Sequence, residues 1–70
     1  MTSREIKQTA TNIKQARLLK GLTQIELAEK AGINANAYAK IERGESDPTL
    51  ATIKKICKAL CMKASDILGY

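Results

Sequence analysis

The stretch from Thr23 to Gly44 constrains the fold more than any other part of this sequence. Thr23 and Glu26 form a T-x-x-E pattern, in which the hydroxyl and the carboxylate each accept from a backbone N–H at the start of a helix. Gly32 stands where a left-handed residue would end that helix, and Asn34, two residues later, is a good N-cap for a second helix. The pattern predicts two short helices joined by a tight turn.

Each of these helices carries one apolar face. The faces consist of Leu27, Ala28 and Ala31 in the first helix, and of Ile33, Tyr38 and Ile41 in the second. Because Ala28 is small, the helices can approach closely and cross at the steep angle of a helix-turn-helix, the unit that places its second helix in the major groove of DNA. The alternative interpretation is an ordinary corner between two helices.

Length and composition favour a single all-α domain. A chain of 70 residues buries only about 60% of its unfolded surface, so its core must be compact. With two tyrosines as the only aromatic residues, the core must come from Ile, Leu and Ala, which suits packed helices better than a sheet. We expect a short N-terminal arm over residues 1–8 and one domain over residues 9–70. Helices are predicted near residues 9–20, 23–30, 35–43, 50–60 and 64–68.

The charge favours a polyanionic partner. The net charge is +5 and the isoelectric point is near 9.5, which suits nucleic acid. No apolar run approaches the roughly 18 residues of a membrane span, and residues 1–8 lack the apolar segment of a signal peptide. We therefore expect a cytoplasmic protein that does not contact a membrane.

Enzymatic activity is not expected. The chain has no His, and its serines are Ser3, Ser46 and Ser65. Both cysteines are expected to be buried, so no nucleophile can be paired with a base. No cofactor is expected either.

The sequence resembles the Cro/C1-type helix-turn-helix family, also called the Xre family, of phage repressors and bacterial regulators. The matching segments are KGLTQIELAEKAGI at residues 20–33, KIERG at residues 40–44, and P-T-L with a later A-L within residues 48–60. The resemblance extends over residues 12–68. It implies a compact five-helix lambda-repressor-like DNA-binding domain, with the helix-turn-helix at its second and third helices. The implied function is a transcriptional regulator, a repressor, that binds double-stranded DNA.

The resemblance also implies a structural ion pair between Arg17 in the first helix and Glu42 at the end of the third. The planar guanidinium matches a carboxylate better than a lysine ammonium does, so the pair would tie the two helices together. Without it, Glu42 would place a bare negative charge near DNA. The alternative for Arg17 is contact with a DNA phosphate.

The outward face of the third helix is the predicted base-reading surface. With Tyr38 and Ile41 inward, the residues left facing out are Asn34, Ala35, Asn36, Ala39 and Lys40. Asn can pair with adenine through two hydrogen bonds, Lys can donate to guanine, and an Ala methyl can pack on the thymine methyl. Asn34 has the alternative role of a helix cap alone, and Asn36 and Lys40 could be ordinary surface residues.

Phosphate contacts are predicted beside this face. The resemblance implies that Gln24, in the first turn of the second helix, holds a phosphate or a flanking base. An ordinary surface glutamine is the alternative. We expect Lys20, Arg43 and the backbone at Gly44 to contact phosphates as well.

The two cysteines are predicted to be core thiols. Cys57 and Cys61 lie four residues apart, on the face of the fourth helix shared with Ile53, Ile56 and Leu60. Leu50 has the helical spacing of the same face, so the lysines of this helix are expected to face solvent: Lys54, Lys55 and Lys58. A zinc site would need two more ligands, and no His can supply them, so no metal is expected. A dimer bridged by cysteines or by a metal is the alternative.

We expect a homodimer on a pseudo-palindromic operator, because one short helix offers few base contacts. Self-association would use the C-terminal helix and tail, with Leu18 and Leu19 as a second apolar surface. The residues expected at the C-terminal interface are Met62, Ile67, Leu68 and Tyr70. Packing in the core is an equal alternative for Ile67 and Leu68.

A second class of function is a protein-binding module. The antitoxin of a toxin–antitoxin pair could use the same fold to hold a partner protein. The arm over residues 1–8 is the segment available for that contact.

Overall fold

The computed structural model describes residues 1–68, which form five helices and the turns between them, without a strand. The helices are α1 (Ser3–Leu19), α2 (Gln24–Ala31), α3 (Ala35–Glu42), α4 (Leu50–Leu60) and α5 (Ala64–Leu68). The predicted all-α class and the five-helix architecture are confirmed. None of these helices is both long and apolar enough to cross a membrane.

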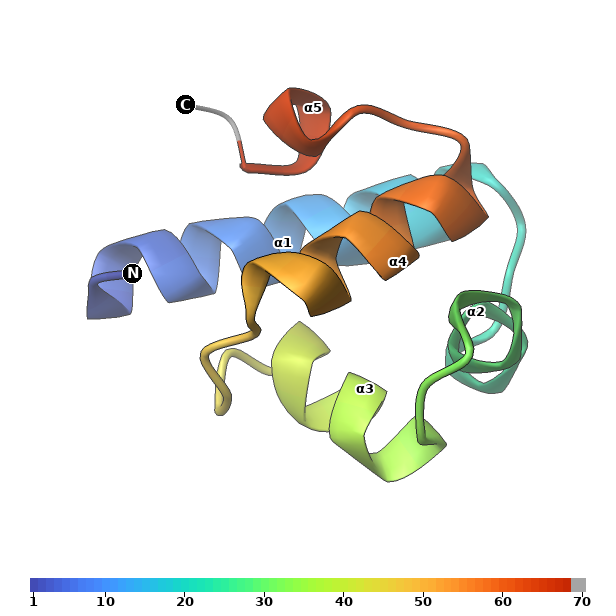
Figure 1. The fold of residues 1–70 in the computed structure, drawn as a ribbon, viewed down its shortest axis with the longest axis horizontal. Helices are drawn as coiled ribbons and strands as arrows, with labels where there is room; N and C mark the ends of the chain where they lie inside the picture. The colour runs from blue at the N-terminus through green and yellow to red at the C-terminus, as the bar shows by residue number, and fades with distance from the viewer. Residues whose placement is uncertain (69–70) are drawn as a thin grey trace.

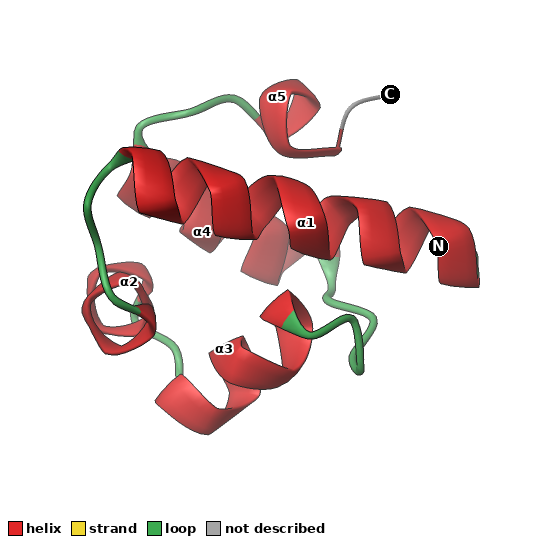
Figure 2. Cartoon of the chain, turned by 180° about the vertical axis from the view of Figure 1, so that it is seen from behind, coloured by secondary structure: helices red, strands yellow, loops and turns green. Residues whose placement is uncertain are grey.

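The helices enclose one apolar core. α4 lies in front of α1 in Figure 1 and behind it in Figure 2, with α5 above this pair and α2 and α3 below it. Each helix contributes a side chain that is 0% exposed: Ile13, Leu27, Tyr38, Ile56 and Ile67, from α1 to α5 in order. Burying a side chain of this size is worth about 1.5–3 kcal/mol. The inward face of α3 is therefore set by packing, which fixes the face that it turns to solvent.

α1 begins at Ser3 rather than near residue 9, so the predicted arm is wrong for residues 3–8. A capping box sets this start. The Glu5 backbone N–H donates to the Thr2 hydroxyl at 3.2 Å, and the Thr2 backbone N–H donates to the Glu5 carboxylate at 2.8 Å. The first turns of α1 reach the loop after α3, where a methyl group added to Gly44 would lie 3.5 Å from Cγ of Lys7.

The helices α1 to α4 all end beside a residue of positive φ. Gly21, Gly32 and Gly44 hold this position after α1, α2 and α3, with φ of 70°, 70° and 74°. After α4 the position is held by Cys61, with φ of 57°. Cys61 thus lies beyond the last residue of α4, and the helical spacing of the α4 apolar face does not extend to it. Cys61 is therefore exposed, which corrects the prediction of a core thiol, whereas Cys57 is buried.

Burial in α4 and α5 departs from the predicted apolar faces. Leu50, expected to face the core, is 60% exposed at the first position of α4. Ile67 packs in the core, so it is not available to the C-terminal dimer surface, and Met62 and Leu68 are half-buried against that core. Tyr70 lies outside the described residues.

Candidate nucleic-acid interface

A buried ion pair ties the end of α3 to α1. Arg17 donates from Nε to Oε2 of Glu42 at 2.9 Å and from Nη2 to Oε1 at 2.8 Å. Its Nη1 donates to the Leu22 carbonyl oxygen at 2.7 Å. The two charged side chains are 10% and 3% exposed, respectively. The structure thus contains the predicted pair, and the Arg17 guanidinium is enclosed within the protein rather than turned toward a phosphate.

Glu42 accepts from two further side chains. The Tyr38 hydroxyl donates to Oε2, and Nε2 of Gln24 donates to Oε1 at 3.2 Å. Burial acts to raise the pKa of Glu42, but the hydrogen bonds from Arg17, Tyr38 and Gln24 outweigh it and hold the pKa below its ordinary value of 4.5. Burial and the adjacent carboxylate raise the pKa of Tyr38, so its hydroxyl keeps the proton that it donates. These four residues, the buried network, hold α1, α2 and α3 together.

Asn34 caps α3. Its Oδ1 accepts from the backbone N–H of Asn36 at 2.8 Å and from that of Ala37 at 3.2 Å. A two-hydrogen-bond contact with adenine needs both the oxygen and the NH₂ group of an Asn side chain. Because the Asn34 oxygen is already used, the prediction that it reads a base in this way is not supported, and the cap is its role in the fold.

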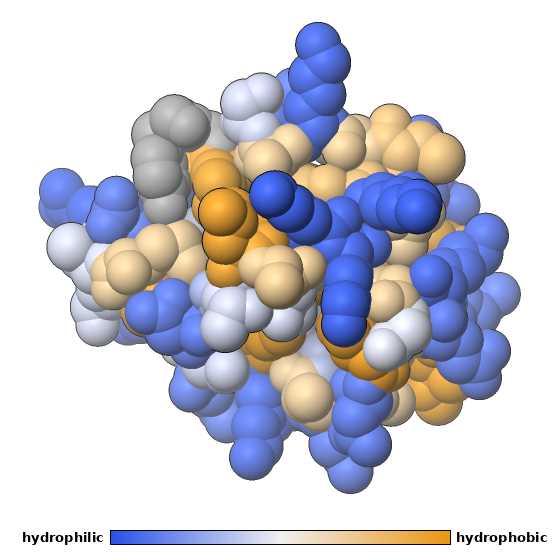
Figure 3. Space-filling view, in the orientation of Figure 1, coloured by the Kyte–Doolittle hydropathy of each residue, from blue (hydrophilic) through white to orange (hydrophobic). Residues whose placement is uncertain are grey.

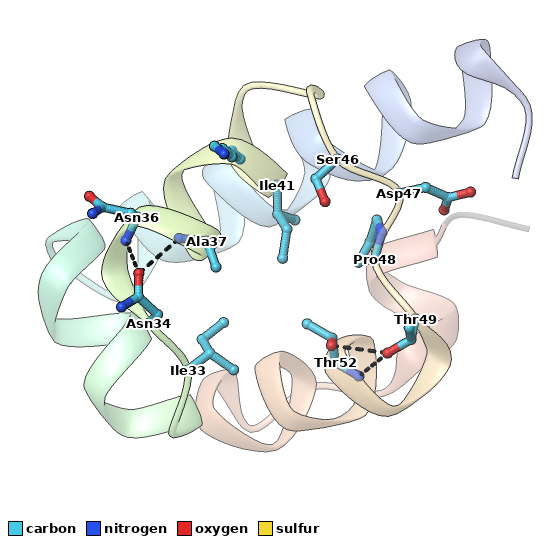
Figure 4. A pocket seen from close by; sticks show the side chains of 11 residues that line it. Ile33, Asn34, Asn36, Ala37, Ile41, Ser46, Asp47, Pro48, Thr49 and Thr52 are labelled. Atoms are coloured by element: carbon cyan, nitrogen blue, oxygen red, sulfur yellow. Dashed lines mark hydrogen bonds between the residues drawn. The ribbon is translucent and has the colours of Figure 1, made fainter.

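The exposed side of α3 presents Asn36, Ala37 and Lys40, which we call the recognition face. In Figure 4 the Asn36 side chain reaches outward from α3. Ala35 and Ala39, also predicted to read bases, are half-buried. Ala37 was not among the predicted residues, although positions 36, 37 and 40 have the spacing of one helix face.

A hollow separates the recognition face from the start of α4 (Figure 4). Its far wall runs through Ser46, Asp47 and Pro48 to Thr49 and Thr52. The Thr52 backbone N–H donates to the Thr49 hydroxyl at 3.2 Å, which caps α4. This wall was not predicted as part of the site, because only the fold brings it beside α3. Its hydroxyl groups give the rim hydrogen-bonding capacity next to the recognition face.

Two of the predicted phosphate contacts keep free donors. Lys20 is exposed at the end of α1. Gln24 is half-buried, with one N–H directed to Glu42, which leaves the second N–H of its amide for a ligand. The start of α2 can therefore hold a phosphate without breaking the buried network.

The other two contacts are already engaged within the protein. Arg43 donates to the exposed Glu45 from Nε at 2.7 Å and from Nη2 at 3.4 Å. The Gly44 backbone N–H donates to the Ile41 carbonyl oxygen at 3.0 Å. The prediction that the Gly44 backbone contacts a phosphate is thus wrong, because its N–H completes the end of α3 and is not free for a phosphate.

Hydrophilic residues predominate over α3, along the lower margin of Figure 3. The lysines predicted to face solvent on α4, Lys54, Lys55 and Lys58, are exposed. Within residues 1–68, no group of three or more His, Cys, Asp or Glu residues is arranged to hold a metal ion. The surface around α3 therefore offers amide, ammonium, hydroxyl and guanidinium donors, the groups that contact phosphates and base edges.

Known proteins resemble this chain in sequence. The model of a helix-turn-helix family, HTH_3, matches residues 13–60. The immunity repressor of Bacillus phage phi105 is 40% identical over 57 residues, which cover 81% of this chain but 40% of that repressor. The HTH-type transcriptional regulator YgzD of Bacillus subtilis is 38% identical over 55 residues, which cover 79% of this chain and 83% of that regulator.

A solved structure shares the fold over almost its whole length. The restriction-modification controller protein C.AhdI of Aeromonas hydrophila has a TM-score of 0.89 at 25% identity, and the match covers 91% of this chain and 97% of that protein. The family model, these relatives and the arrangement of α2 and α3 agree. The chain belongs to the Cro/C1-type helix-turn-helix family, whose members are DNA-binding transcriptional regulators and not enzymes.

Proposed function

We propose that this protein is a sequence-specific repressor that binds double-stranded DNA as a homodimer on a pseudo-palindromic operator. In this proposal α3 enters the major groove, and Asn36, Ala37 and Lys40 meet the base edges. Lys20, Gln24 and Arg43 hold the phosphates on either side. The cytoplasmic location expected from the sequence stays a prediction.

The exposed side of α3 carries this proposal. Its opposite side is fixed by the core and by the buried network, whereas Asn36 and Lys40 are exposed. Among the described residues, no side chain forms a hydrogen bond or an ion pair with either of these two side chains. A rigid helix that holds unused donors toward solvent is suited to direct reading of bases.

Homodimerisation rests on the geometry of duplex DNA. One α3 reads few base pairs, and two copies related by a two-fold axis double both the contacts and the length of the site. Ile67 is in the core, so a C-terminal interface would rely on Met62, Leu68 and the tail. Leu18 and Leu19, which are 58% and 87% exposed, form a second apolar surface for association.

No observation favours the antitoxin alternative. It relied on a separate arm over residues 1–8, and residues 3–8 are part of α1. A segment that is already folded into a helix is less suited to wrap around a partner protein.

Selection of bound sites from a pool of random duplexes tests the proposal. We expect pseudo-palindromes whose half-sites are centred one DNA turn apart, about 10–10.5 bp, or a multiple of that distance. Asymmetric sites with a single core would contradict dimeric binding.

The salt dependence of binding is a second test. Affinity for the selected site should fall steeply as salt is raised, because each phosphate neutralised adds about 0.9 to the slope of log affinity against log salt concentration. An absence of salt dependence would contradict binding through this surface.

A further inference from the structure

Arg43 and Glu45 form an exposed ion pair directly after the recognition face. The guanidinium meets the carboxylate through Nε and Nη2, at 2.7 and 3.4 Å, and the side chains are 53% and 55% exposed. An arginine presents two N–H groups along this edge, which match two carboxylate oxygens or two phosphate oxygens equally well. In the free protein, Glu45 therefore occupies the edge of Arg43 that a phosphate would use.

The backbone holds Glu45 in this position. Its N–H donates to the Lys40 carbonyl oxygen at 2.9 Å, and the preceding Gly44 N–H donates to the Ile41 carbonyl oxygen at 3.0 Å. Both bonds belong to the end of α3, so a loop movement that carried Glu45 away would have to open that turn. Arg43, and to a smaller extent Lys40, lower the pKa of Glu45, so the carboxylate is charged at neutral pH.

We propose that Glu45 sets the affinity for DNA by competing with the phosphate backbone for Arg43. This inference rests on the proposed function, in which Arg43 contacts a phosphate. Each duplex has to displace the carboxylate from Arg43, and the carboxylate then stays beside the DNA as a like charge. Phosphates carry no sequence information, so Glu45 weakens binding to all duplexes by a similar factor and leaves the preferred sequence unchanged.

An opposite role for Glu45 would be to orient Arg43 for the phosphate. The geometry does not favour it, because the carboxylate fills the Nε edge of the guanidinium instead of leaving it open toward the solvent. An exposed pair is also held weakly, which makes exchange of one anion for another easy. The two roles predict opposite changes in affinity when the Glu45 charge is removed.

Glu45→Gln removes the charge and keeps the shape of the side chain. We expect affinity for both a random duplex and the selected operator to rise about three-fold or more at low salt, and the salt slope to grow by about 0.9 for each subunit bound. Glu29→Gln is the matched control, because Glu29 is exposed on α2 and forms no ion pair with any described residue. It changes the net charge equally, so its smaller gain measures the effect of net charge alone.

A double-mutant cycle identifies the partner. In an Arg43→Ala background, the gain in affinity from Glu45→Gln should shrink toward that of Glu29→Gln, because no guanidinium is left to release and only the repulsion between the carboxylate and the DNA is removed. Equal gains from Glu45→Gln and Glu29→Gln, a gain that persists in full without Arg43, or a loss of affinity would each overturn the inference. A wild-type protein that binds no duplex even at low salt would instead overturn the proposed function. Thermal melting of each variant checks that the fold is retained.

Discussion

Two arginine–glutamate pairs lie at the end of α3, and their surroundings give them different roles. Arg17 and Glu42 are almost fully enclosed, whereas Arg43 and Glu45 are more than half exposed. Both pairs use two hydrogen bonds between a guanidinium and a carboxylate. The difference is that Glu42 also accepts from Tyr38 and Gln24, while Glu45 has Arg43 as its side-chain donor.

The comparison shows how burial separates structure from binding within one short segment. Removal of one partner from the enclosed pair would leave a charge that water cannot reach, so that pair is part of the scaffold. In the exposed pair, water or a phosphate can replace either partner, so the pair can exchange when DNA binds. The same two residue types can thus fix α3 in the enclosed pair and, as proposed above, adjust in the exposed pair how strongly DNA is bound.

The largest expected effect is the loss of stability when the enclosed pair is broken. Glu42→Ala leaves the Arg17 guanidinium and the Tyr38 hydroxyl without their acceptor, and should reduce the free energy of unfolding by about 3 kcal/mol. In a domain of this size, each kcal/mol corresponds to about 4–8 °C in Tm. Thermal and urea denaturation measure the change.

The exposed pair supplies the control for this experiment. Glu45→Ala should leave Tm almost unchanged, because the Arg43 and Glu45 charges are both already solvated in the wild type. If Glu42→Ala prevents folding, Glu42→Gln retains an acceptor and should be intermediate in stability. A Glu42→Ala protein as stable as the wild type would show that the enclosed pair does not hold α3 to α1.

Acid should separate the wild type from Glu42→Gln. The pKa of Glu42 in the folded protein lies below 4.5, so its ionised form stabilises the fold above that pH, and the contribution is lost as the pH falls through the folded-state pKa. The wild type should therefore lose more unfolding free energy than Glu42→Gln between about pH 7 and about pH 3. Urea denaturation at constant ionic strength measures both curves.

Other carboxylates do not obscure this difference. Hydrogen bonds to the capping threonines lower the pKa values of Glu5 and Glu26, and Arg43 lowers that of Glu45. These groups are present in both proteins, so they contribute equally to the two curves. Parallel curves would mean that Glu42 adds nothing to acid sensitivity.

Substitutions on the recognition face should have the opposite effects to Glu42→Ala, because they should reduce affinity for DNA and leave stability almost unchanged. Asn36→Ala and Lys40→Ala remove exposed side chains, so Tm should hardly change. Affinity for the selected operator should fall by about 1–3 kcal/mol for each base that the variant no longer reads, with smaller decreases on random duplexes. Binding titrations on both duplexes measure this. An early-melting variant that keeps its sequence preference would place that side chain in the scaffold instead.

Local sequence patterns predicted the fold because they act over a few residues. The Thr23 capping box, the Gly32 turn and the Asn34 cap each depend on positions within one helical turn, and all three are present in the structure. The T-x-x-E pattern at residues 2–5 was equally visible, so the late start expected for α1 was an avoidable error. The Arg17 pair was predicted through family resemblance, because its partner is distant in the sequence.

Features that depend on neighbours in space were not predictable in this way. Helical spacing placed Leu50 and Cys61 with the apolar face of α4, but burial requires another element over the side chain, and both are exposed. The contact of Gln24 with Glu42 joins two helices, and no pattern within α2 indicates it. The sequence therefore predicted which side of a helix faces the solvent more reliably than which side chains on that side are free of contacts with other elements.

Gln24 tests the boundary between scaffold and interface, with the smallest expected effects. Gln24→Ala removes the 3.2 Å hydrogen bond to Glu42, which should cost about 1 kcal/mol of stability, less than Glu42→Ala because Arg17 and Tyr38 keep their acceptor. The same change removes the proposed phosphate contact, so affinity should fall similarly on operator and random duplexes, in contrast to Asn36→Ala. Gln15→Ala, at an exposed position of α1, controls for the loss of a glutamine side chain. Denaturation and binding titrations on the same preparations separate the two effects: a drop in stability alone would assign Gln24 to the buried network, and a drop in affinity alone would assign it to the interface.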